Sequence, residues 1–77
     1  MLTYLRLGSD SLEEARLYWT MQEAINAFAS CALELDLYGQ SIEGSLHFVG
    51  SRDEEPAEYP DRVLALGPRG GIQVHRT

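Results

Sequence analysis

The fold is decided by residues 62–75, which read Arg-Val-Leu-Ala-Leu-Gly-Pro-Arg-Gly-Gly-Ile-Gln-Val-His. Two short runs of apolar residues flank Gly67-Pro-Arg-Gly70, and glycine and proline supply the backbone conformations of a tight turn. The pattern predicts a β-hairpin with strands at 62–66 and 71–76. A phosphate-binding loop is the alternative for these glycines, but such loops open a helix and usually carry a lysine, whereas a strand follows here.

Two further strands are predicted upstream of the hairpin. Residues 2–7 are rich in β-forming residues, and apolar side chains fall on both faces, Leu5 and Leu7 opposite Leu2 and Tyr4. Residues 42–49 alternate between an apolar side and a polar side, and Gly44 is a weak point in that strand. The apolar side holds Ile42, Leu46 and Phe48, and the polar side holds Glu43, Ser45 and His47.

One long helix is predicted between these strands, at residues 12–36. Ser11-Leu-Glu-Glu14 has the form of a capping box, in which the Ser11 hydroxyl and the Glu14 carboxylate each accept from the other residue's amide. Apolar residues then recur at helical spacing along one side, and Gly39 stands where a helix typically ends. A helix of this length spans roughly 36 Å, so it is expected to bend or to project beyond a small sheet.

These elements predict a single α+β domain over residues 1–77, of order β-α-β-β. The helix is expected to pack on a three- to four-stranded mixed or antiparallel sheet, with a right-handed crossover if the first two strands are parallel. A chain of 77 residues lies near the lower size limit for an unaided core. A helix longer than its sheet and apolar residues on both faces of strand 2–7 leave hydrophobic surface uncovered, which predicts a homodimer.

The charge is divided unevenly along a chain that contains no lysine. Residues 1–61 hold all twelve acidic residues against three arginines, a net charge of −9, and residues 62–77 hold three arginines and no acid. Five of the acids fall in residues 52–61, Arg-Asp-Glu-Glu-Pro-Ala-Glu-Tyr-Pro-Asp. This balance disfavours nucleic acid as a direct partner and favours a basic surface, such as that of a protein that binds DNA or RNA.

The loop at residues 51–61, called the acidic segment below, has two interpretations. It is either a solvated loop that aids solubility or a recognition surface whose carboxylates imitate a phosphate backbone, with Pro56 and Pro60 limiting its flexibility. The predicted partner contacts are Asp53, Glu54, Glu55, Glu58 and Asp61, then Glu13, Glu23 and Glu34 on the exposed face of the helix, and Arg69 at the hairpin tip. Trp19, at the apolar border of the helix, is either a lid on the core or an interface anchor.

No catalytic, cofactor-binding or metal-binding motif is found, so we expect no enzymatic activity, no cofactor and no metal. Cys31 is the only cysteine, which excludes an internal disulfide, and no ligand spacing links it to His47 or His75. Glu54 and Glu55 lie in one solvated loop, not in the two differing environments that acid–base catalysis needs. No stretch approaches the roughly 18 apolar residues of a membrane span and no signal peptide is recognised, so the cytoplasm is the expected location.

The whole layout resembles the small acidic anti-CRISPR proteins of bacteriophages, inhibitors of type I CRISPR systems in particular. The resemblance is carried by the short length, the pI near 4.6, the helix opening Ser-Leu-Glu-Glu-Ala at 11–15, and residues 59–72, Tyr-Pro-Asp-Arg-Val-Leu-Ala-Leu-Gly-Pro-Arg-Gly-Gly-Ile. It implies a stoichiometric inhibitor in the host bacterial cell that binds a Cas subunit of an effector complex and blocks target DNA. The alternative is a homodimeric, antitoxin-like protein that neutralises a basic partner.

Overall fold

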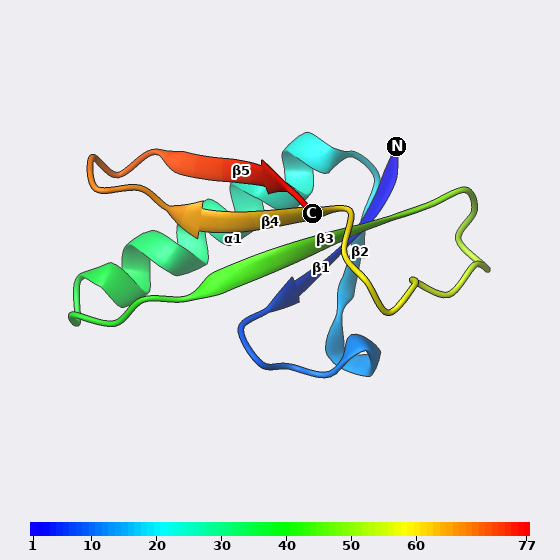
Figure 1. Ribbon diagram of the computed structural model, residues 1–77, viewed down its shortest axis with the longest axis horizontal. Coiled ribbons are helices and arrows are strands. Elements are labelled where there is room, and N and C mark those ends of the chain that lie inside the picture. The colour runs from blue at the N-terminus through cyan, green and yellow to red at the C-terminus, as the bar shows by residue number, and fades with distance from the viewer.

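One helix packs across one face of a five-stranded antiparallel sheet (Figure 1). The computed structural model describes residues 1–77. The elements along the chain are β1 (Leu2–Leu7), a 3-10 turn η1 (Leu12–Glu14), β2 (Arg16–Tyr18), α1 (Met21–Asp36), β3 (Glu43–Val49), β4 (Arg62–Leu66) and β5 (Ile72–Arg76). In space the strands run β2-β1-β3-β4-β5, and every neighbouring pair is antiparallel. The α+β class and the hairpin are confirmed, and no parallel crossover exists.

The predicted helix start was wrong, because residues 12–18 form η1 and β2 instead. Ser11 and Glu14 do meet, since the Ser11 amide and hydroxyl both donate to Glu14 Oε1, at 3.2 and 3.1 Å. These bonds close a single 3-10 turn that ends at Ala15. A capping sequence starts a helical turn but does not extend it, and the run Leu-Tyr-Trp-Thr that follows at 17–20 favours a strand.

The helix begins at Met21, and Thr20 is its N-cap: the Thr20 hydroxyl accepts from the Glu23 amide at 3.1 Å. Residues 16–18 add the strand that the sequence did not predict, paired with β1 so that Thr3 lies opposite Tyr18. The helix has 16 residues, about 24 Å at 1.5 Å each, so it is shorter than the predicted one. The boundary of β3 differs by one residue from the prediction, and so does the start of β5.

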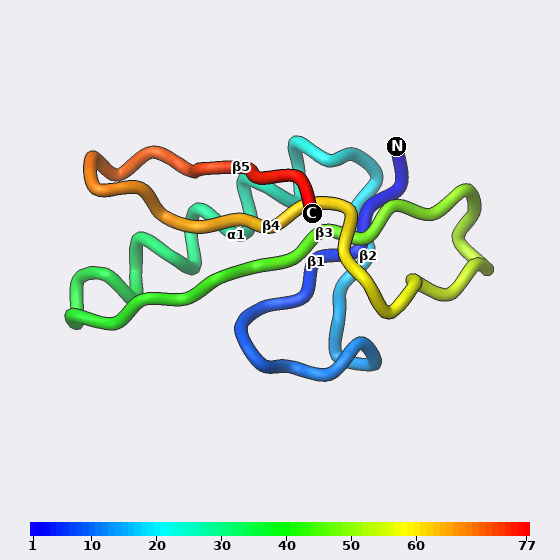
Figure 2. Tube along the Cα trace, viewed as in Figure 1, coloured from blue at the N-terminus to red at the C-terminus, as the bar shows by residue number.

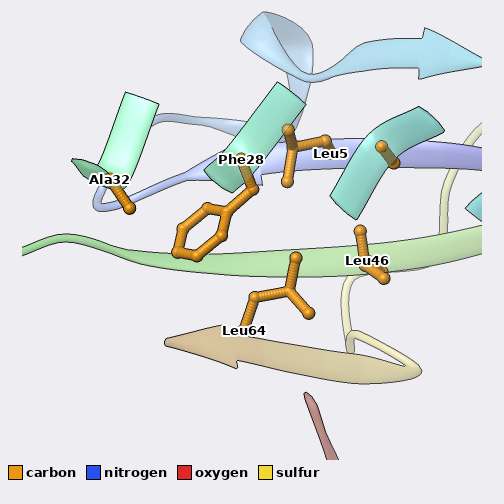
Figure 3. Packing of buried hydrophobic residues seen from close by; sticks show 6 residues of the cluster. Leu5, Phe28, Ala32, Leu46 and Leu64 are labelled. Atoms are coloured by element: carbon orange, nitrogen blue, oxygen red, sulfur yellow. The ribbon is translucent and has the colours of Figure 1, made fainter. Parts of the chain in front are cut away.

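The hydrophobic core lies between α1 and the sheet. It consists of Leu5, Ala24, Phe28, Ala32, Leu46 and Leu64, and Figure 3 shows Phe28 lying over β3 between Leu5 and Leu64. A Cβ atom at Gly44 would lie 2.7 Å from Phe28 Cδ1. Gly44 therefore gives the Phe28 ring room against the backbone of β3, which explains a glycine inside a strand.

The molecule is elongated, with principal dimensions of 37 × 20 × 20 Å. The β4–β5 turn lies at one end of the long axis, and the acidic segment, which joins β3 to β4, lies at the other (Figure 1). The turn uses Gly70 at φ +83°, a left-handed conformation that favours glycine. No helix in the structure has both the length and the apolar character that crossing a membrane requires.

Candidate partner-binding surface

A hydrogen-bonded chain of polar side chains lies on the sheet face opposite α1. Arg6 Nε–H donates to Ser45 Oγ at 3.2 Å, Ser45 Oγ lies 3.1 Å from His47 Nε2, and His47 Nδ1 lies 2.8 Å from the Ala57 carbonyl oxygen. A carbonyl only accepts, so Nδ1 carries the proton and Nε2 accepts from the Ser45 hydroxyl. These hydrogen bonds join β1, β3 and the acidic segment through a neutral imidazole.

Burial favours that neutral state of His47. The side chain has no exposed surface, and Ser45 is only 6% exposed. Desolvation by burial lowers the pKa of His47 from its ordinary value of 6.5, and Arg6 adds to this shift, while the Ala57 carbonyl and Asp61 oppose it. The imidazole is therefore uncharged at pH 7.

Ser45 and His47 form a hydroxyl–imidazole pair that the sequence did not predict. The arrangement is that of a nucleophile beside a base, but both side chains are buried. Arg6 also donates to the serine oxygen, and neither residue lines any of the main surface depressions. In this setting the pair holds the acidic segment on the sheet.

Backbone and carboxylate hydrogen bonds fix the two ends of the acidic segment. At its far end, Phe48 N–H donates to Asp61 Oδ2 at 2.8 Å, and Asp61 N–H donates to the Leu46 carbonyl at 2.7 Å. At its near end, Gly50 N–H donates to Glu54 Oε1 at 3.2 Å. The Thr77 hydroxyl donates to the Pro60 carbonyl, which brings the C-terminus beside the start of β4 (Figure 2).

Trp19 gives the acidic segment another contact. Its side chain is 63% exposed, so it is not a lid on the core. The Arg52 guanidinium lies over the indole, 5.3 Å from the ring centre, within the range of a cation–π interaction. Arg52 stands at the start of the acidic segment and Trp19 follows β2, so this contact joins the segment to the β2–α1 corner.

The five predicted contacts in the acidic segment therefore have two different roles. Glu54 and Asp61 accept hydrogen bonds from backbone amides and help to shape the segment. All five carboxylates are exposed, and Asp53, Glu55 and Glu58 are the three that accept no hydrogen bond from the segment itself and can meet a partner. The segment is thus a folded part of the structure, and three of its exposed carboxylates are free of internal hydrogen bonds.

Glu13 joins these carboxylates, although it was predicted on the exposed face of the helix. It belongs to η1, and together with Glu55 it lines a depression of about 430 Å³ whose other walls are Tyr4, Leu12, Ala15 and Pro56. Glu23 and Glu34 lie on α1, on the other side of the sheet. Arg69 lies in the β4–β5 turn, at the opposite end of the molecule (Figure 1). The nine predicted residues thus occupy three separate surfaces.

Sequence reasoning missed Arg6, Ser45 and His47 as the residues that position the acidic segment. A usable signal was present, because Leu2 and Tyr4 are apolar residues on the same face as Ser45 and His47. An apolar second face indicates that something covers it, and the cover was attributed to a second copy of the chain. Part of the cover comes from the acidic segment, whose Ala57 carbonyl meets His47, and Tyr4 lies in the depression between the segment and η1.

The described side chains include no group of three or more His, Cys, Asp and Glu placed to hold a metal ion. The chain matches no protein-family model, no curated protein and no solved structure.

Proposed function

We propose that this protein is a binding protein that inhibits a basic, nucleic-acid-handling partner by covering its nucleic-acid-binding surface with carboxylates. The observation that carries the proposal is the anchored acidic segment, which holds Asp53, Glu55 and Glu58 on a fixed backbone. A surface that is already ordered loses less conformational entropy on binding than a flexible loop does.

The charge of this surface favours association with arginine- and lysine-rich grooves. Carboxylates arranged opposite basic side chains speed encounter and discriminate against wrong partners. Each exposed ion pair contributes only about 0.2–1 kcal/mol, so the effect depends on several carboxylates acting together. Salt screens such contacts over about 8 Å at physiological ionic strength, and the association rate should therefore fall as salt is added.

The depression between η1 and the acidic segment suits a basic side chain of the partner. Glu13 and Glu55 supply negative charge at its wall, and Leu12 and Pro56 supply apolar surface. Arginine and lysine bury their aliphatic stems against such surface while the charged group meets carboxylates, and Tyr4 adds an aromatic side chain to the lining. This arrangement makes one arginine or lysine of the partner the natural anchor of the contact.

The class of partner follows from the resemblance to phage anti-CRISPR proteins. It points to a Cas subunit of a type I effector complex in the cytoplasm of the host bacterial cell. The basic groove that such a complex uses for target DNA is the surface that the carboxylates are proposed to occupy.

A direct experiment measures binding of labelled target DNA by purified type I effector complexes that are first mixed with this protein. The parent should abolish DNA binding near one equivalent. Two sets of isosteric substitutions then separate the surfaces, each removing four negative charges. The test set is E13Q, D53N, E55Q and E58Q, and the matched control set on α1 and β3 is E23Q, E34Q, D36N and E43Q.

We expect the test set to raise the amount of protein needed to block DNA binding at least tenfold and the control set to leave it within about twofold, because charges more than about 8 Å from the contact are largely screened. An equal loss of inhibition in both sets would mean that only the net charge of the protein matters. A loss of inhibition in the control set alone would mean that the contact lies on the α1 side. If no type I complex binds the parent, the proposed target is wrong.

A further inference from the structure

Strand β5 is an open edge of the sheet. It pairs with β4 on one side and with nothing on the other, and α1 packs on β1 to β4. The register runs without a bulge from Leu66 opposite Ile72 to Arg62 opposite Arg76. Natural edge strands are usually shielded by shortness, charged side chains, proline, a bulge or a covering element. The five residues of β5 include one charged side chain, Arg76, and neither a proline nor a bulge.

The hydrogen-bond pattern shows which groups of β5 are free. Gly67 N–H donates to the Gly71 carbonyl at 2.7 Å, and bonded and non-bonded pairs alternate along an antiparallel ladder. Gln73 and His75 are therefore the residues of β5 that bond to β4. The amides and carbonyls of Ile72, Val74 and Arg76 point away from the sheet.

We propose that β5 pairs with β5 of a second copy of this chain, antiparallel, with the two-fold axis at Val74. In this register Val74 lies opposite its own copy, and Ile72 lies opposite Arg76 of the partner. All three are bonded pairs that exchange two hydrogen bonds each. A single symmetric arrangement thus satisfies every free backbone group of the strand, and the two sheets become continuous.

Side chains and charges agree with this pairing. Val74 lies opposite buried Leu64 in the β4–β5 register and is 42% exposed, so contact with its own copy removes an exposed apolar side chain from water. The two copies of Arg76 are offset by four residues, about 14 Å at about 3.4 Å per residue. This exceeds the screening length of about 8 Å, so like charge does not prevent the pairing.

A second copy is the occupant that the edge favours over a strand of another protein. An antiparallel strand can pair with an identical strand across a two-fold axis. Residues 62–77 contain no acidic residue, so this edge offers no carboxylate to a basic strand of another protein. The other edge, β2, has only three residues. A contact of one strand pair falls below about 1,200 Å² and is of the weak class, so we expect micromolar dissociation.

This dimer has a different basis from the one that the sequence predicted. The predicted reasons were a helix of roughly 36 Å and an uncovered apolar face of strand 2–7. The helix is shorter than that, and the acidic segment returns to the face opposite α1 at His47. The pairing does not depend on the proposed function, since β5 carries none of the proposed contacts.

Sedimentation equilibrium across the micromolar range tests the proposal. The parent should shift from 8.6 kDa toward twice that mass as concentration rises. Val74→Pro removes only an amide that points outward, which an edge strand tolerates, and Val74→Lys sets two lysines opposite each other in the dimer. Both should stay monomeric. Leu33→Lys is the matched control, because Leu33 is 46% exposed on α1, and it should dimerise like the parent.

Circular dichroism confirms that each variant is folded, and Val74→Lys alone suffices if the proline variant does not fold. A parent that stays monomeric throughout the micromolar range overturns the proposal. So does a dimer that persists in Val74→Lys, because a different surface would then hold it together.

Discussion

The two faces of the sheet are built from different interactions. On the α1 side, the core is a cluster of six buried apolar residues. On the opposite side, Arg6, Ser45 and His47 form a series of hydrogen bonds that reaches the acidic segment at the Ala57 carbonyl. Apolar packing is strong and independent of pH, whereas a hydrogen-bonded layer contributes less and depends on protonation. The first face therefore sets the stability of the fold, and the second positions the candidate surface.

The largest expected effect comes from Phe28→Ala on the α1 side. Phe28 is fully buried between α1 and β3, and truncating a buried phenylalanine typically costs about 3–5 kcal/mol. Small domains have total stabilities at the low end of about 5–15 kcal/mol, so the variant should keep little of its stability. Urea denaturation followed by circular dichroism measures this, and a loss under about 1 kcal/mol would contradict the assigned core.

His47→Phe perturbs the opposite face and should cost less, about 1–3 kcal/mol. It keeps a ring of similar size but leaves the Ser45 hydroxyl and the Ala57 carbonyl without their partner. We expect the amides of the acidic segment to exchange hydrogen faster while those of β1 and β3 stay protected. His75→Phe is the control, because His75 is exposed on β5. Equal effects of the two substitutions would show that the hydrogen bonds of His47 do not hold the acidic segment in place.

Thr20→Ala and Ser11→Ala compare the two capping residues. Thr20 caps α1, which packs on the sheet, so its loss should cost about 1 kcal/mol. Ser11 closes only the 3-10 turn η1, and its loss should cost a few tenths of a kcal/mol. Thermal melts of both variants give the ranking. A larger loss for Ser11→Ala would mean that the helix starts near residue 12 after all.

Lowering the pH should have the smallest effect, and only through the face opposite α1. The pKa of His47 in the folded protein lies below its unfolded value of 6.5, so below pH 6.5 the unfolded chain binds a proton that the folded chain does not. Stability is therefore full above pH 6.5 and falls as pH drops toward the folded pKa. Comparing stability at pH 7.5 and pH 5.5 checks this: His47→Phe should lose this part of the pH dependence and His75→Phe should keep it.

Sequence patterns predicted the α1 side better than the opposite side. The alternation of Leu46 and Phe48 in the third strand and the hairpin at 62–76 identified the core face and the order of the last strands. Two features needed information that local patterns lack. A capping sequence at Ser11 does not say how far a helix extends, and β2 forms because β1 is there to pair with it.

The candidate surface was predicted in its residues but not in its structure. Asp53, Glu55 and Glu58 were named from charge and spacing alone. The polar alternation of Ser45 and His47 is typical of a solvated strand face and outweighed the apolar Leu2 and Tyr4 on that face, whereas in the structure both polar side chains are buried. Glu13 joined the same surface because η1 replaced the first turns of the expected helix.

The most direct test of whether the acidic segment is held rigid is a measurement of backbone ¹⁵N order parameters across its residues 51–59 in the free protein. If the acidic segment is anchored through His47, Glu54 and Asp61, its order parameters should lie near the roughly 0.85 typical of rigid backbone. The residues of β3 and β4 should give similar values. In His47→Phe the values of the acidic segment should fall while the strand values stay unchanged. Values below about 0.6 in the parent protein would mean that the segment is a flexible solvated loop, and would contradict a preorganised binding surface.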